Sequence, residues 1–246
     1  MKDNVTHERY EFKYLLRHKV SEEIKHQVNH FMEIDQFAKL KLNKEYFIRS
    51  IYFEDDFNSN FDEKVNGFKI RKKFRIRYYG KDQNNSPLYL EAKGRNLERT
   101  YKRRIKIDET DIELIKKKDF LYKLVRKYPS SHIINEFVFE SYRKKLKPKV
   151  VIDYNRSPYV NKHGLYFRLT FDQNISCIKL NDNFGNLNKN HSVLCEAGYT
   201  ILEVKFDRSI PAWFHRIIQS YDLRRQSISK FVLGMTYSKL GKETSD

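Results

Sequence analysis

The chain has 246 residues, and its 49 Lys and Arg against 32 Asp and Glu give a formal net charge of +17. This length suits one large domain or two small ones, and the charge favours nucleic acid, an anionic membrane surface or soluble phosphate compounds as partners. No apolar run approaches the about 20 residues that span a bilayer, and the N-terminus lacks a signal-peptide core.

Charged and apolar residues alternate in short stretches along the first half of the chain, which is the periodicity of a β-strand. One helical segment interrupts them, where a Ser is followed by two Glu residues. The predicted elements are, in order, a strand at 9–16, a helix from Ser21 as N-cap to about residue 33, a strand at 47–53, a short helix and turn at 57–67, and strands at 69–79, 88–93 and 99–107.

Apolar residues at helical spacing then occupy about 109–146, where Pro129 divides the region into two or three helices. Alternation returns after this region, and the chain ends in a helical pattern. The later predicted elements are strands at 148–156, 165–173 and 198–207, a helical stretch at 211–222 and a final helix at about 226–236.

No composition shift marks a domain boundary, so we expect one domain over residues 1–246. The order of strands, helical insertion, strands and helices indicates the α+β class. About eight antiparallel strands with one charged face suggest a closed β-tunnel, because closure removes the sheet edges and creates an interior. Helices are expected to pack outside the tunnel, with the C-terminal helix as its cap.

The charged face of these strands is mainly basic. Lys73, Arg75 and Arg77 alternate with Phe74 and Ile76, and most other predicted strands show the same arrangement. Arg forks and Lys ammonium groups bind phosphate oxygens, although a solvated outer face would give the same pattern in any single strand. Over the whole set, a surface that binds a polyanion is favoured. The candidate residues are Lys13, Lys73, Arg75, Arg77, Lys93, Lys102, Arg104, Arg156, Arg168 and Lys205.

Three carboxylates share this face and are candidate ligands of a divalent metal: Glu11, Glu91 and Glu203. Metal-dependent phosphoryl transfer needs only one or two protein carboxylates, because the phosphates supply further ligands. The alternative is that each Glu only pairs with a neighbouring Lys. Lys230, on the last predicted helix, is by itself typical of a solvated residue.

Other chemistries find less support in the sequence. The chain has no Gly-Lys-Ser/Thr phosphate loop or kinase glycine loop, and no helix-turn-helix, zinc-finger or RNP signature, so no specific nucleic-acid partner is expected. Cys177 and Cys195 lack a metal-ligand spacing and indicate free thiols in a reducing compartment. We therefore expect a cytoplasmic protein.

An ordered set of short motifs resembles a known family over about residues 7–240. The motifs are Arg-Tyr-Glu-Phe-Lys-Tyr (9–14), Ser-Ile-Tyr-Phe (50–53), Phe-Arg-Ile-Arg-Tyr-Tyr-Gly (74–80), Leu-Glu-Ala-Lys (90–93), Lys-Arg-Arg-Ile (102–105), Tyr-Asn-Arg (154–156), Phe-Arg-Leu-Thr-Phe-Asp (167–172), Ile-Leu-Glu-Val-Lys (201–205) and Ser-Lys-Phe (229–231). Together they resemble the VTC domain, the polyphosphate polymerase domain of the vacuolar transporter chaperone complex, a member of the triphosphate tunnel metalloenzymes.

The resemblance implies an antiparallel β-tunnel that moves the γ-phosphate of ATP onto a growing polyphosphate chain with Mn²⁺ or Mg²⁺. It implies that Glu203 is the metal-binding glutamate and that Lys230 reaches the phosphate from the last helix. By motif position it implies the family's phosphate-binding set: Lys13, Arg75, Arg77, Lys93, Lys102, Arg156 and Arg168. The expected partners are ATP and polyphosphate.

One position departs from the wider superfamily, because Arg9 stands where hydrolytic members carry the first Glu of a Glu-x-Glu-x-Lys strand. This favours the polymerase branch. The membrane segments of the eukaryotic complexes are not in this sequence, which favours a stand-alone bacterial-type enzyme and leaves a membrane-protein partner open. Two alternatives use the same site: hydrolysis of tripolyphosphate or a nucleoside triphosphate, and polyphosphate binding without catalysis. A generic nucleic-acid-binding role ranks behind them.

Overall fold

The computed structural model of the protein describes residues 4–6, 9–80, 86–97, 99–108, 111, 117, 119–162, 164, 166–180 and 192–241. Within these ranges, eleven strands form one antiparallel sheet. The strands are β1 (Asn4–Thr6), β2 (Tyr10–Arg17), β3 (Met32–Ile34), β4 (Tyr46–Glu54), β5 (Ile70–Tyr79), β6 (Leu88–Asn96), β7 (Arg99–Ile107), β8 (Lys147–Asn161), β9 (Phe167–Lys179), β10 (Ser192–Leu194) and β11 (Tyr199–Phe206). Most of them follow the order β1–β7–β6–β5–β4–β8–β9–β11–β2, while β10 pairs with β9 and β3 with β8.

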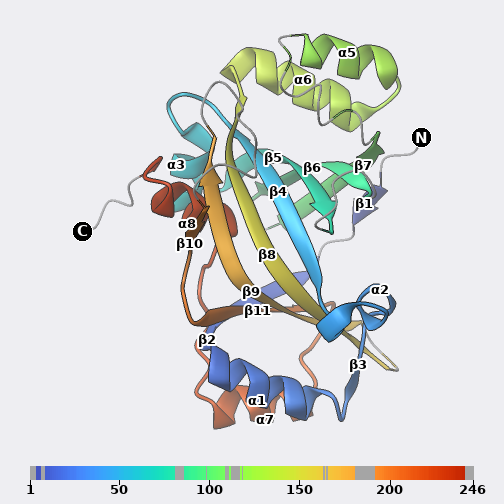
Figure 1. The fold of residues 1–246 in the computed structure, drawn as a ribbon, viewed down its shortest axis with the longest axis vertical. Helices are drawn as coiled ribbons and strands as arrows, with labels where there is room; N and C mark the ends of the chain where they lie inside the picture. The colour runs from blue at the N-terminus through green and yellow to red at the C-terminus, as the bar shows by residue number, and fades with distance from the viewer. Residues whose placement is uncertain are drawn as a thin grey trace.

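The helices lie around this sheet (Figure 1). They are α1 (His18–Val28), α2 (Gln36–Lys39), α3 (Ser59–Val65), α5 (Phe120–Lys127), α6 (His132–Lys144), α7 (Ala212–Ser220) and α8 (Lys230–Tyr237), with a 3-10 turn at Leu42–Lys44. Among the described residues, no helix has the length and apolar character needed to cross a bilayer.

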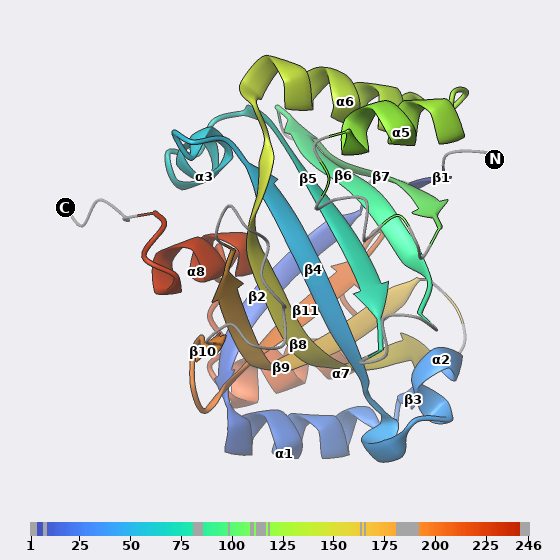
Figure 2. The same ribbon diagram turned by 45° about the horizontal axis from the view of Figure 1, so that its top comes forward.

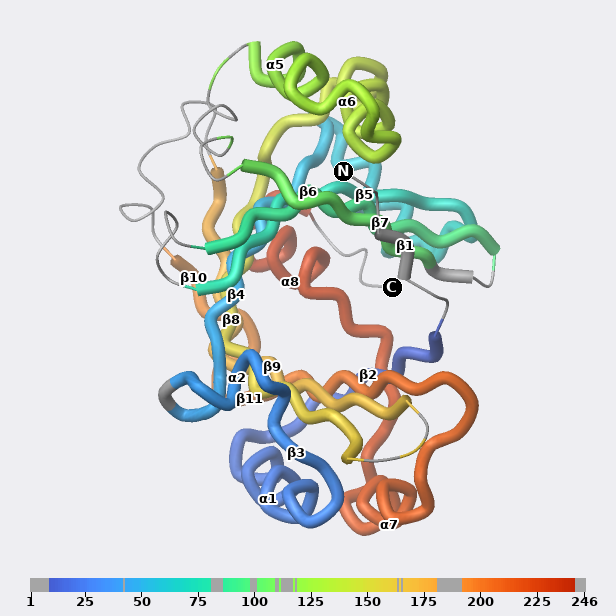
Figure 3. The backbone as a smooth tube through the Cα atoms, turned by 90° about the vertical axis from the view of Figure 1, so that its right-hand side faces the viewer, coloured from blue at the N-terminus to red at the C-terminus, as the bar shows by residue number. Residues whose placement is uncertain are grey.

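The sheet is strongly curved, so that β5, β6 and β7 lie across from β2, β9 and β11, with β4 and β8 joining the two halves (Figure 3). Helices α5 and α6 cover the outer face at one end of the molecule, and α1 and α7 cover the other end (Figure 2). Phe74 and Ile76 of β5 are buried under α6, which directs the side chains of Lys73 and Arg75 to the concave face.

Helix α8 packs against the concave side of the sheet instead. Its Phe231 lies 5.1 Å from Tyr52 of β4, measured between ring centroids. A Cβ at Gly234 would come within 2.7 Å of Ile152 of β8, so only glycine allows the helix this close to the strand. With α3 beside it, α8 fills one end of the concave space, in the position expected for the C-terminal helix.

The sheet is open within the described residues, since β1 and β2 end the strand order and do not pair with each other. An extended segment between α7 and α8 runs beside β2 instead (Figure 3). Gln226 donates a backbone hydrogen bond to the Lys13 carbonyl at 2.8 Å, and Lys13 Nζ donates to the Ile228 carbonyl at 3.0 Å. The α+β class and the peripheral helices are confirmed, whereas closure of a tunnel of about eight strands is not.

Two predicted helices begin elsewhere. Helix α1 starts at His18, directly after β2, and Ser21 is a buried residue inside the helix rather than its N-cap. The last helix starts at Lys230, where Ser229 is the N-cap and accepts a hydrogen bond from the Val232 amide. Much of the predicted helical segment at 109–118 lies outside the described residues.

Candidate functional site

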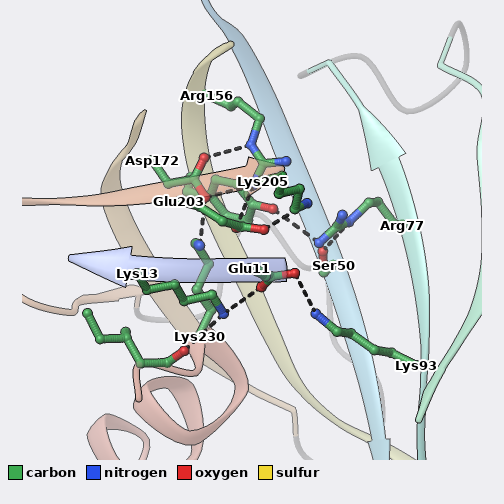
Figure 4. Close-up of polar contacts among 12 residues, drawn as sticks. Glu11, Lys13, Ser50, Arg77, Lys93, Arg156, Asp172, Glu203, Lys205 and Lys230 are labelled. Carbon is green, nitrogen blue, oxygen red and sulfur yellow. Dashed lines mark hydrogen bonds and ion pairs between the residues drawn. The ribbon is translucent and has the colours of Figure 1, made fainter. Parts of the chain in front are cut away.

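The concave face of the sheet encloses a cavity of about 360 Å³. Eight strands contribute side chains to it, and the first turn of α8 borders it. Every predicted basic residue lines this cavity: Lys13, Lys73, Arg75, Arg77, Lys93, Lys102, Arg104, Arg156, Arg168, Lys205 and Lys230. Figure 4 shows several of them converging from different strands. The structure therefore gathers them into one site and does not spread them over an outer surface.

Glu91 is fully buried beneath the cavity lining, where it holds Arg75. Its Oε2 accepts a hydrogen bond from Arg75 Nε at 2.8 Å and lies 2.6 Å from Nη2, while Arg75 Nη1 donates to the Tyr52 hydroxyl at 2.7 Å. Burial raises the pKa of Glu91, but the charges of Arg75 and Arg77 outweigh it and hold the pKa well below its usual range. The predicted metal ligand Glu91 thus lies outside the cavity lining, in a position to orient Arg75.

Asp172 of β9 plays the same part on the opposite half of the sheet. Its two oxygens accept hydrogen bonds from Arg156 Nε and Nη2 at 2.6 and 2.7 Å, and Lys230 Nζ lies 2.6 Å from Oδ2. Burial raises the pKa of Asp172, and the neighbouring cations lower it below the usual value. Sequence reasoning missed this residue, although it shares strand parity with Arg168 and Thr170.

Glu203 of β11 lines the cavity itself. Its Oε1 lies 2.7 Å from Lys205 Nζ, and its Oε2 lies 3.7 Å from Arg156 Nη2 (Figure 4). Burial raises the pKa of Glu203, but Lys205, Lys13 and Arg156 together lower it well below the usual value, so the carboxyl is ionised.

Glu11 of β2 is the other lining carboxylate and lies between two lysines (Figure 4). Its oxygens are 3.1 Å from Lys13 Nζ and 3.5 Å from Lys93 Nζ. Burial and the charge of Glu203 raise the pKa of Glu11, but the charges of the surrounding lysines outweigh both effects and lower this pKa to about 2.

The lining suits a divalent cation held jointly with phosphate. No group of three or more His, Cys, Asp or Glu side chains that could hold a metal is found in the described residues. Mg²⁺ and Mn²⁺ at phosphoryl-transfer sites use one or two carboxylates and take their remaining ligands from phosphates and water. The two ionised carboxylates Glu203 and Glu11 are hard oxygen donors and match this requirement.

Arg77 and Lys73 are paired less closely with carboxylates. Arg77 donates to the Ser50 hydroxyl at 3.0 Å and to the Tyr154 hydroxyl at 3.1 Å, and its Nη1 lies 3.9 Å from Glu91 Oε2. Lys73 has no carboxylate partner within the described part of the chain, and its ammonium lies 4.7 Å from the Phe231 ring centroid. Burial, followed by the charges of nearby cations, lowers the pKa of Lys73 well below its usual value. A bound anion would stabilise this excess of buried positive charge.

The charge of Lys102 changes near neutral pH. Burial lowers the pKa of Lys102 to about 7, with Arg75 and Arg104 adding to the decrease and Glu91 opposing it. Above pH 7 the lysine of the empty cavity is therefore largely neutral, and an incoming polyanion must recruit a proton to it. In the ligand-free protein, the same lysine makes the unfolding free energy increase as pH rises from about 7 toward 10.5, since the unfolded chain then binds the extra proton.

We expect tripolyphosphate affinity to fall about fivefold to tenfold from pH 7 to 9 for this reason. Calorimetry in two buffers of different ionisation enthalpy would measure the proton uptake at each pH. The Lys102→Gln variant should lose this component and retain only the titration of the ligand. Equal pH profiles for the variant and the wild type would contradict the assignment.

No curated protein matches the chain. Solved structures that match the chain include the PH1819 protein of Pyrococcus horikoshii, with 12% identity, a TM-score of 0.46 and coverage of 94% of this chain and 99% of that one. They also include HpAC1 of Hippeastrum, which has a dominant triphosphatase activity, with 12% identity, a TM-score of 0.42 and coverage of 92% and 96%. The inorganic triphosphatase NE1496 also matches, with 12% identity, a TM-score of 0.27 and coverage of 85% and 84%. The family model of the VTC domain matches residues 8–239, nearly the whole chain, and the protein therefore belongs to the VTC domain family.

Proposed function

We propose that the protein is a metal-dependent polyphosphate polymerase that transfers the γ-phosphoryl group of ATP to the end of a polyphosphate chain. Membership of the VTC domain family supports an activity on triphosphate or polyphosphate. The observation that carries the proposal is the cavity, in which the predicted basic residues surround only two lining carboxylates, Glu11 and Glu203, among the described residues. Such a site binds a chain of phosphates better than any neutral ligand.

The reaction exchanges one phosphoanhydride bond for another. The bond between the γ-phosphorus and the β–γ bridging oxygen breaks, a bond forms from a terminal oxygen of the acceptor chain to the γ-phosphorus, and ADP leaves. The protein contributes mainly position and charge. Arg75 and Arg156 are fixed by Glu91 and Asp172 before the substrate arrives, so their guanidinium groups need little reorganisation to bind the phosphates.

Glu203 and Glu11 would hold the divalent cation, which when bound neutralises part of the charge that develops on the phosphates. Lys205, Lys13 and Lys93 now offset the charge of these carboxylates. When metal and phosphate are present, those lysines become available to the phosphate oxygens. The same set of side chains therefore serves the empty and the loaded site.

Aromatic side chains at one end of the cavity suit the nucleoside of the donor. Tyr46 and Tyr79 line the cavity there, with ring centroids 5.9 Å apart, and Phe37 and Tyr89 lie against them at 5.0 and 6.0 Å. Nucleobases stack on such rings with little regard to their hydrogen-bonding edges. ATP bound with its base at this end would extend its phosphates along β5 toward Arg77 and Arg75.

Incubation of the purified protein with ATP and Mn²⁺ or Mg²⁺ tests the proposal. We expect polyphosphate chains that lengthen with time on a polyacrylamide gel, ADP in equal amount to the phosphate incorporated, and no product when the metal is chelated. Release of free phosphate without chains would indicate hydrolysis instead. Tight tripolyphosphate binding without ATP consumption would indicate a non-catalytic binding protein.

A further inference from the structure

Six lysines line the cavity, and five of them lie within ion-pair distance of a carboxylate. The pairs join Lys13 and Lys93 to Glu11, Lys102 to Glu91, Lys205 to Glu203 and Lys230 to Asp172, with nitrogen–oxygen distances from 2.6 to 3.8 Å. For Lys73, the sixth, no such carboxylate is found among the residues that the structure describes. A carboxylate beside an ammonium group holds the proton on the nitrogen, so Lys73 lacks the contact that keeps the other five charged.

The groups around Lys73 are cationic or aromatic instead. Its direct cross-strand partner on β6 is Lys93, and Arg75 follows it on the same face of β5. The Lys73 nitrogen lies 4.7 Å from the ring centroid of Phe231 and 5.9 Å from that of Tyr52. An aromatic face stabilises a cation less than a carboxylate does, and the two neighbouring like charges oppose protonation of Lys73.

This environment favours the uncharged amine. Burial, followed by the charges of Lys93 and Arg75, lowers the pKa of Lys73 well below its usual value. A desolvated lysine next to other cations is an arrangement that makes a lysine amine nucleophilic in proteins. The amine is also within reach of a small reagent, because Lys73 is only half-buried and lines the cavity of about 360 Å³. The structure thus places a nucleophilic amine among groups that bind phosphate.

We propose that Lys73 is a site of covalent acylation by small acyl phosphates, of which acetyl phosphate is the simplest probe. The phosphate of the reagent would bind the cations beside Lys73, which brings the acyl carbon to the amine. Lys73 Nζ attacks the acyl carbon, an amide bond forms, and the bond from this carbon to the bridging oxygen breaks. Inorganic phosphate leaves with the electron pair of that bond and takes up the proton that the amine loses. The same cations stabilise the negative charge of the leaving phosphate.

Acylation removes one positive charge from the cavity, so the modified protein should bind phosphate chains more weakly. Bound tripolyphosphate should prevent the reaction, because it occupies the same cations and its charge keeps Lys73 protonated. The reaction needs only that the cavity accepts a phosphate group. It therefore does not depend on whether the protein polymerises, hydrolyses or only binds phosphate chains.

Peptide mass spectrometry of the whole chain after incubation with acetyl phosphate and a chelator tests the proposal. At neutral pH we expect Lys73 to gain an acetyl group at least about tenfold faster than the exposed Lys19 of α1, since each unit by which a pKa falls gives about tenfold more free amine. Tripolyphosphate should slow the reaction at Lys73 and leave that at Lys19 unchanged. Acetic anhydride, which carries no phosphate, should show a smaller preference for Lys73.

Two variants of Lys73 separate its reactivity from its charge. K73R keeps a cation and should lose the fast acetylation, whereas the matched control K19R should retain it. K73Q resembles the acetylated lysine and should bind tripolyphosphate about tenfold more weakly than K73R, the loss expected for one hydrogen bond to a charged group. Equal affinity of K73Q and K73R would contradict the expected weakening of phosphate binding.

Four results would overturn the proposal: acetylation no faster at Lys73 than at Lys19, faster acetylation of another cavity lysine, no protection by tripolyphosphate, or an equal preference for Lys73 with acetic anhydride. Addition of a phosphoryl group in place of the acetyl group would overturn it as well. Selective acetylation of a protein that makes no phosphate chains would refute the polymerase proposal and support this one. Chain synthesis by a protein that shows no selective acetylation would do the reverse.

Discussion

The Glu203→Gln variant is expected to lose about 100-fold to 1,000-fold of the rate of metal-dependent phosphoryl transfer, the range found when one preorganised charge or dipole is removed from an active site. Glu203 and Glu11 are the carboxylates that line the cavity, and glutamine is a much weaker ligand for a hard cation. Turnover of ATP at saturating metal and at saturating nucleotide would measure the loss.

Binding without metal should change in the opposite direction. Glu203 offsets the charge of Lys205 at 2.7 Å, so its neutralisation raises the positive charge of the cavity and strengthens tripolyphosphate binding in the presence of a chelator. The control Glu33→Gln changes an exposed carboxylate of β3 and should leave both quantities unchanged. Retention of wild-type turnover in Glu203→Gln would remove the proposed metal site, and a loss of both turnover and tripolyphosphate binding would indicate a damaged cavity.

The strand parity of the sequence predicted most of this site because one face of each strand had to be apolar. On β5, burial of Phe74 and Ile76 under α6 leaves only the concave face for Lys73 and Arg75. The same reasoning works wherever a helix covers the outside of the sheet. It could not show whether the other face was enclosed, which depends on the curvature of the sheet and on the placement of α8.

The roles of the carboxylates were less predictable, because they depend on depth below the surface. Glu91 and Glu203 have the same alternation with a neighbouring Lys, yet Glu91 is covered by Arg75 whereas Glu203 lines the cavity. Asp172 was missed because its partner Lys230 is distant in sequence and comes from α8. Lys230 itself was identified only through the family resemblance, since a lysine at the start of a helix is ordinarily solvated.

The Asp172→Asn variant is expected to lower the unfolding free energy of the ligand-free protein by about 3 kcal/mol or more, the cost of removing one partner from a buried ion pair. Asp172 has no exposed surface and compensates both Arg156 and Lys230. For a protein of this size, the loss corresponds to a decrease in melting temperature of about 6–12 °C. The control Asp222→Asn removes a carboxylate that is 82% exposed, and its effect should stay within about 0.5 kcal/mol.

Tripolyphosphate should restore part of the stability of Asp172→Asn, because its oxygens replace the missing negative charge beside Arg156 and Lys230. The increase in melting temperature at a given tripolyphosphate concentration is therefore expected to be larger in the variant than in the wild type. Turnover should fall as well, since Arg156 is no longer fixed by two hydrogen bonds before the substrate binds. An equal increase in both proteins would mean that the bound phosphates do not approach Arg156 and Lys230, and the placement of the chain in the cavity would have to be revised.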